Sequence, residues 1–151
     1  MTVAFDSDVL IYAGIPENTL GQRVLRFIKT IEETGVAGVG SVLLLIEVLS
    51  KPTRMGSGDE QARLEAILSH IDLRPCDSIT ATNALTLAVK YGLKAADAVH
   101  LATAVSAGAD RFLTNNRRDF PKTIEEIDIV YPDDLPDSRP AAETQLDRGR
   151  P

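Results

Sequence analysis

Short β-type runs alternate with longer helical segments along most of this 151-residue chain. Between the runs, apolar residues recur at helical spacing, for example over residues 20–31. This alternation is typical of a parallel sheet whose strands are joined by crossover helices. We therefore predict an α/β fold with a parallel sheet of about four or five strands. The predicted strands are residues 3–5, 36–39, 71–73, 111–114 and, as an edge strand, 127–131.

The length of the chain favours one domain, because a chain of this size buries roughly two-thirds of the surface of its unfolded state. We place this domain at residues 1–131. Residues 132–151 are rich in Pro, Asp, Arg and Ala, and they predict a tail that is flexible or bound to a partner. No window approaches the ~20 apolar residues of a membrane span. The N-terminus lacks the regions of a signal peptide, so we expect a cytoplasmic protein without membrane contact.

Charge and cysteine content exclude several classes of protein. A net charge of −6 argues against a broad electrostatic grip on DNA or on an anionic membrane, although it allows a local basic rim around a site. Cys76 is the only cysteine, which excludes an internal disulfide and thiolate-rich metal sites. We expect Cys76 to be a small core residue.

Three carboxylates stand alone in apolar stretches of the sequence. Asp6 closes the run 3–5, Glu47 interrupts residues 42–49, and Asp97 lies within Ala-Ala-Asp-Ala-Val. A carboxylate removed from water without a partner is costly, so these residues suggest a shared cation. Oxygen ligands fit Mg²⁺, or Mn²⁺ in its place, better than zinc.

Each of these residues also has a purely structural alternative. Asp6 can cap the loop after its strand, and Glu47 can extend to solvent from its helix. Asp97 falls in the first turn of a helix, where the macrodipole favours negative charge. Asp8 either adds charge to the site or caps a helical turn. His100, three residues after Asp97, is either a metal ligand or a buried, hydrogen-bonded packing residue.

Four segments, taken in order, resemble the motifs of PIN-domain nucleases. The first has an aspartate at the end of the first strand, and the second has Ser41 followed by Glu47. The third contains Asp97, and the fourth follows a threonine with polar residues. The resemblance covers residues 3–131, and the ordered set is more specific than any one motif. The segments are FDSDVLIY (5–12), SVLLLIEVL (41–49), LKAADAVHLATA (93–104) and LTNNRRDF (113–120).

The resemblance implies a three-layer α/β/α, Rossmann-like domain with the activity of a metal-dependent ribonuclease. It most often denotes the VapC-like toxin of a toxin–antitoxin pair, which works as a homodimer and binds a small antitoxin. Asp6, Glu47, Asp97 and Asp119 are then the catalytic metal ligands, and Asn115 or Asn116 is the alternative to Asp119. Expected products carry a 5′-phosphate and a 3′-hydroxyl. The residues that could contact RNA phosphates, or form only a solvated rim, are Lys51, Arg54, Asn116, Arg117 and Arg118.

Two further classes of function are compatible with parts of the sequence. The segment Asp6-Ser7-Asp8-Val9 also fits the opening motif of haloacid dehalogenase-like phosphatases, in which the first aspartate is the nucleophile. That interpretation leaves Glu47 and Asp97 unexplained, and the sequence has no convincing later lysine and paired-aspartate motif. A PIN-like fold with weak or lost cleavage that serves as an interaction module is the third class.

Overall fold

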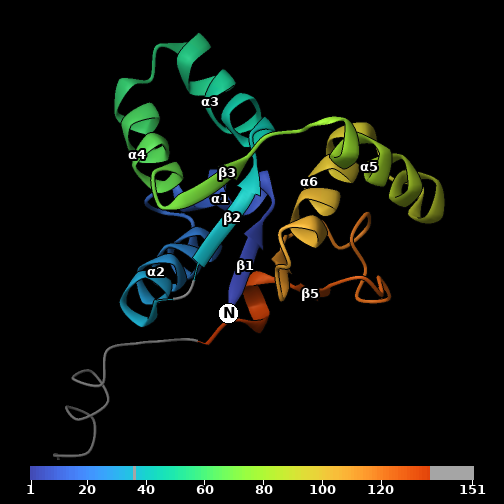
Figure 1. Cartoon of the computed structure of the whole chain (residues 1–151). Coiled ribbons are helices and arrows are strands. Elements are labelled where there is room, and N and C mark those ends of the chain that lie inside the picture. The colour runs from blue at the N-terminus through green and yellow to red at the C-terminus, as the bar shows by residue number, and fades with distance from the viewer. Residues whose placement is uncertain (36, 137–151) are drawn as a thin grey trace, which may run out of the picture.

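The computed structural model describes residues 1–35 and 37–136, which fold as a parallel sheet between layers of helices (Figure 1). The five strands have the order β3-β2-β1-β4-β5, and every neighbouring pair is parallel. The predicted α/β class, the number of strands and the edge position of the last strand are confirmed. The strands are β1 (Thr2–Phe5), β2 (Ala37–Ser41), β3 (Ile71–Arg74), β4 (Arg111–Leu113) and β5 (Asp128–Val130).

Helices cover both faces of the sheet and form two separate hydrophobic cores. Val3 and Phe5 of β1 point into one core, and Ala4 points into the other, as the period of two along a strand requires. The first core is lined by the first four helices, the second by the last two. The helices are α1 (Ser7–Ala13), α2 (Thr19–Thr34), α3 (Leu43–Met55), α4 (Gly58–Leu68), α5 (Ser78–Tyr91) and α6 (Ala95–Ser106).

The carboxyl end of β1 is the point at which the strand order reverses. From β1 the chain passes first to β2 on one side, and only later returns to β4 on the other side. The register pairs Phe5 with Leu113, and the backbone N–H of Asp6 donates to the carbonyl of Leu113 at 2.9 Å. Open α/β sheets bind ligands at such a switch point, so the fold places Asp6 at the edge where a site is expected.

In the sequence, Pro52 predicts the end of a helix and residues 55–59 predict a loop, and the structure corrects both boundaries near helix α3. This helix does not end at Pro52, which is buried inside it, but continues to Met55 and is capped by Gly56 with a φ of 66°. The loop predicted over residues 55–59 is consequently only Gly56 and Ser57. Cys76 was also expected in the core, but it is exposed.

The packed part of the chain extends beyond the predicted boundary at residue 131. A 3₁₀ turn, η1 (Pro132–Asp134), follows β5, and Leu135 is buried in the first core. Residues 137–151, most of the predicted tail, lie outside the described residues. Within residues 1–35 and 37–136, no helix is both long and apolar enough to cross a membrane.

Close packing of α1 against α2 provides a test of the fold. A Cβ atom on Gly21 would lie 1.8 Å from the carbonyl oxygen of Tyr12, so Gly21→Ala must separate the two helices. We expect the free energy of unfolding to fall by about 3 kcal/mol in urea denaturation. Gly58→Ala is the matched control, because nothing lies within 4 Å of the added Cβ. Equal stability of the two variants would contradict the close approach.

Candidate active site

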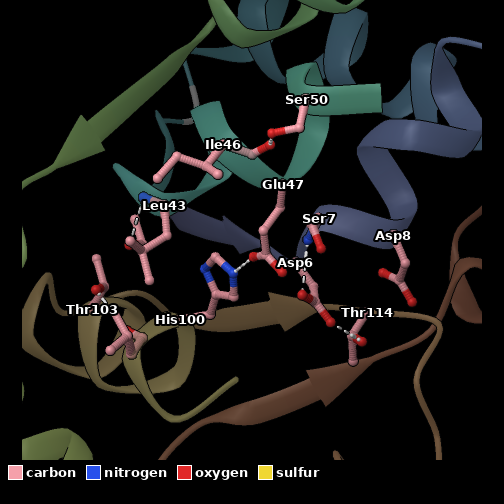
Figure 2. A network of polar contacts seen from close by, with 12 residues as sticks. Asp6, Ser7, Asp8, Leu43, Ile46, Glu47, Ser50, His100, Thr103 and Thr114 are labelled. Carbon is pink, nitrogen blue, oxygen red and sulfur yellow. Dashed lines mark hydrogen bonds and ion pairs between the residues drawn. The ribbon is translucent and has the colours of Figure 1, made fainter. Parts of the chain in front are cut away.

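Asp6 is a buried carboxylate whose two oxygens are both hydrogen-bonded. Its exposed fraction is 4%, its Oδ1 accepts from the N–H of Ser7 at 2.8 Å, and its Oδ2 accepts from the hydroxyl of Thr114 at 2.7 Å (Figure 2). Burial raises the pKa of the Asp6 carboxyl, and the Thr114 hydrogen bond, the charge on His100 and the Ser7 hydrogen bond lower it part of the way back. The predicted burial of Asp6 is confirmed, and the structure shows in addition that Asp6 is the N-cap of α1.

Asp8 adds a further carboxylate beside Asp6. Its Oδ1 accepts from the N–H of Val9 at 2.7 Å and its Oδ2 from the N–H of Asn115 at 3.1 Å. Burial, followed by the negative charges of Asp6 and Asp97, raises the pKa of Asp8 to about 7. Both interpretations of Asp8 therefore hold, because it bonds the first turn of α1 and also contributes charge near the site.

Glu47 reaches from α3 over the edge of the sheet. It lies between His100 and Asp6 in Figure 2, and its Oε1 is hydrogen-bonded to Nε2 of His100. The side chain of Glu47 is 34% exposed, whereas that of His100 is 1% exposed. The apolar run around Glu47 suggested a desolvated carboxylate, but α3 leaves Leu45 and Ile46 exposed as well. The energetic argument for a buried charge thus applies to Asp6 and not to Glu47.

Asp97 joins the same group of charges from the first turn of α6. Burial raises the pKa of Asp97, the charges of Asp6 and Asp119 raise it further, and His100 opposes them. A smaller increase comes from Glu47. Charges that perturb one another in this way lie near one another, so the four carboxylates selected from the sequence share one electrostatic environment.

The fourth position contains an aspartate and an asparagine that bind each other. The side-chain amide of Asn116 donates to Oδ2 of Asp119 at 2.9 Å, and the N–H of Asp119 donates to Oδ1 of Asn116 at 3.2 Å. The N–H of Asn116 also donates to Oγ1 of Thr114 at 3.0 Å. Thr114 therefore connects this loop to Asp6, although sequence reasoning did not select it as a functional residue. The feature that could have identified Thr114 is its position directly after β4, where the strand register places it opposite Asp6.

The donor chemistry of the site fits a hard divalent cation. The carboxylates supply oxygen ligands. Burial and, after it, their mutual repulsion raise the pKa values of Asp6, Asp8 and Asp97, and a cation would offset both effects. Direct coordination is not preformed, however. Among the described residues, no three His, Cys, Asp or Glu side chains form a group that could hold one ion.

The basic residues selected from the sequence lie at the surface. Lys51 and Arg54 are exposed on α3, and Arg118 is exposed after β4. Arg117 is exposed too, but it donates to Asp133 at 2.6 Å, and its guanidinium lies 4.4 Å from the ring centre of Tyr131. Within residues 1–35 and 37–136, Lys51, Arg54 and Arg118 make no ion pair. They are therefore available to an anionic ligand, whereas Arg117 must first leave Asp133.

Comparison with known proteins gives a family match over most of the chain. The sequence pattern of the PIN domain matches residues 3–126. A search of curated proteins gives no significant match.

Several solved structures share the fold. A toxin–antitoxin complex from Klebsiella pneumoniae aligns with a TM-score of 0.65 and 23% identity, over 86% of this chain and 97% of that one. VapBC2 from Rickettsia felis, bound to a promoter DNA fragment, aligns with a TM-score of 0.68 and 16% identity, over 87% of this chain and 98% of that one. FitAcB from Neisseria gonorrhoeae aligns with a TM-score of 0.67 and 20% identity, over 88% of this chain and 99% of that one. These similarities establish the fold.

The raised pKa of Asp8 predicts a pH dependence of stability when divalent ions are removed. The folded state binds a proton up to about pH 7, whereas the unfolded state releases it near the ordinary aspartate pKa of 3.8. Stability should therefore fall as the pH rises through this window, by on the order of 2–4 kcal/mol from Asp8. Asp8→Asn should remove the part of this loss that comes from Asp8. The measurement is the free energy of unfolding in urea, with EDTA present, at pH 5 and pH 8.

The control for this prediction is Asp59→Asn, at an exposed position outside the site. It should keep the pH dependence of the unmodified protein. An Asp8→Asn variant that loses as much stability as the unmodified protein between the two pH values would contradict the assignment.

Proposed function

Since this chain belongs to the PIN domain family, we propose that it is an Mg²⁺-dependent endoribonuclease and the toxin of a toxin–antitoxin pair. PIN domains are in general nucleases that depend on divalent metal ions. The observation that carries the proposal is the convergence of carboxylate charge at the switch point of the sheet. Mn²⁺ is the alternative ion, because it accepts the same oxygen ligands.

In this proposal the ion is held by Asp6, Glu47 and Asp97, with Asp119 or Asn116 as the fourth ligand. When bound, it supplies a water of lowered pKa and neutralises charge that builds up on the phosphate. Asp6 contributes a fixed carboxylate, because Thr114 and Ser7 already orient both of its oxygens. A pre-oriented ligand does not have to reorganise during the reaction.

Substrate binding is assigned to the basic residues around the site. Lys51, Arg54 and Arg118 are exposed on the segments that carry Glu47 and Asp119, where they can pair with RNA phosphates. Arg117 and the side-chain amide of Asn116 complete the proposed contacts. RNA as the substrate, and products with a 5′-phosphate and a 3′-hydroxyl, follow from the family resemblance.

A small antitoxin and a second copy of this chain are the proposed protein partners. Support for the antitoxin is that the structural neighbour from K. pneumoniae is a toxin–antitoxin complex. The homodimer is supported by α5, which exposes Ile79, Leu85 and Val89 to solvent at 71%, 65% and 79%. Apolar side chains grouped on one helix are typical of a protein interface.

The phosphatase alternative is less consistent with the structure. In that mechanism the second aspartate of the motif must act as a general acid. Asp8 occupies that position, but the mechanism gives no role to Glu47 and Asp97, whose charges act on one another and on Asp6. If the unmodified protein does not cleave RNA in the next experiment, the result would favour an interaction module without cleavage.

Removing single ligands should abolish cleavage without unfolding the chain. We expect Asp6→Asn and Asp97→Asn each to lower Mg²⁺-dependent RNA cleavage by roughly 100-fold or more. Cooperative urea unfolding should persist in both variants, because Asn has nearly the shape of Asp, and at position 6 its oxygen can still accept from the N–H of Ser7. Asp59→Asn, outside the site, should cleave at the unmodified rate. Undiminished cleavage by both site variants, after purification from host nucleases, would overturn the proposal.

The toxin assignment predicts a phenotype. Induced expression in a bacterial host should arrest growth, because uncontrolled RNA cleavage stops protein synthesis. Expression of Asp97→Asn at an equal level should not arrest growth. Co-expression of a small protein encoded beside this chain should restore growth and co-purify with it. Normal growth with active enzyme in the cells would contradict the toxin role while leaving the nuclease assignment standing.

A further inference from the structure

The hydrogen bond between His100 and Glu47 joins two helices that belong to different halves of the molecule. Helix α3 packs on α4 and α1, and its Leu44 and Val48 belong to the first core. Helix α6 packs on α5 and the sheet, and its Leu101 belongs to the second core. Figure 1 shows α3 and α6 on opposite sides of the sheet. The contact between Glu47 and His100 therefore spans the edge at which the acidic site lies.

The two nitrogens of the His100 ring have different environments. Nε2 contacts the Glu47 carboxylate, which can only accept, so Nε2 carries the proton. Nδ1 is the one buried side-chain nitrogen or oxygen in the described residues that has no hydrogen-bond partner. The bond from Nε2 to Glu47 is therefore the only side-chain hydrogen bond that the described residues give this ring. His100 is thus arranged to donate one hydrogen bond in one direction.

Glu47 depends on such a donor more than Asp6 and Asp8 do. The oxygens of Asp6 and Asp8 are fixed by neighbouring backbone and hydroxyl groups, whereas the hydrogen bond that the structure shows for Glu47 comes from His100. Its side chain is long and 34% exposed, so without this donor it could rotate towards solvent. In Figure 2 the bond directs the carboxylate towards Asp6.

We propose that His100 is a positioning residue, which holds the Glu47 carboxylate in the acidic site by donating from Nε2 across the sheet edge. The inference rests on the proposed function, because it assigns a role within the same site. His100 acts through Glu47 and does not itself bind the ion or the RNA, since its single donor is committed to Glu47 and its other nitrogen is buried.

The test compares three substitutions of His100 in the full chain. In His100→Gln the amide nitrogen replaces Nε2, in His100→Asn it lies nearer the position of Nδ1, and in His100→Leu the donor is absent. Binding of Mn²⁺ alone, without RNA, is measured by calorimetry. We expect His100→Leu and His100→Asn to weaken Mn²⁺ binding by about tenfold or more, and His100→Gln to recover most of the affinity. Urea unfolding shows which variants are folded.

A double-mutant cycle separates positioning from a general structural effect. In a Glu47→Gln background, His100→Leu should cause no further loss of Mn²⁺ affinity, because the carboxylate to be positioned is already gone. Cleavage assays should show a lower kcat with a nearly unchanged KM for RNA in His100→Asn. If His100→Leu does not fold, the comparison of the Asn and Gln variants decides the matter.

The outcomes distinguish this inference from the proposed function. Wild-type Mn²⁺ affinity in His100→Asn, or an equal further loss in the Glu47→Gln background, would overturn the positioning role even if RNA is cleaved. Absence of RNA cleavage by the unmodified protein would overturn the proposed function. The dependence of Mn²⁺ binding on His100 would then still be measured independently.

Discussion

The hydrogen bond from Thr114 to Asp6 is the interaction on which the rest of the site depends. Asp6 is 4% exposed, and a carboxylate in that environment requires donors that do not move. The parallel pairing of Phe5 with Leu113 supplies one, because it places the next residue of each strand side by side at the carboxyl edge. Thr114 also accepts from the N–H of Asn116, so the same hydroxyl orients the loop that ends in Asp119. A shift in this register would separate the two ends of the site.

The acidic group stabilises the folded chain poorly unless something compensates its charge. The pKa values of Asp6, Asp8 and Asp97 are all raised, with burial as the first cause in each case and neighbouring carboxylates as a further one. Raised carboxyl pKa values mean that the ionised forms destabilise the folded state near neutral pH. Structural carboxylates normally show the opposite shift, as Asp77 does where it caps α5. A group of carboxylates with raised pKa values at one edge of the sheet is characteristic of a functional site.

The sequence predicted those features that depend on local patterns, and it missed those that depend on tertiary contacts. The strands and the placement of Asp6 followed from apolar periodicity, because a short strand that ends in an acid is visible within a few residues. The sequence left open whether Glu47 is buried or extends to solvent, because the apolar residues beside it, Leu45 and Ile46, suggest burial although they are themselves exposed. The bond from Asn115 to Asp8 and the burial of Leu135 each join residues far apart in the sequence. Asn116 and Asp119, which the sequence left as alternatives, bind each other in the structure, and that contact is not visible in the sequence.

Two independent cores explain why side-chain contacts matter so much at the sheet edge. The helices that carry Glu47 and Asp97 pack on opposite faces, so no shared hydrophobic contact determines the distance between their carboxylates. That distance instead depends on the sheet beneath them and on polar bonds across its edge. Among the described residues, His100 provides such a bond directly to Glu47, while Thr114 and Asn115 provide the equivalent bonds to Asp6 and Asp8. A site assembled in this way can adjust to an ion and a phosphate, because a rotation of one side chain changes its geometry without repacking either core.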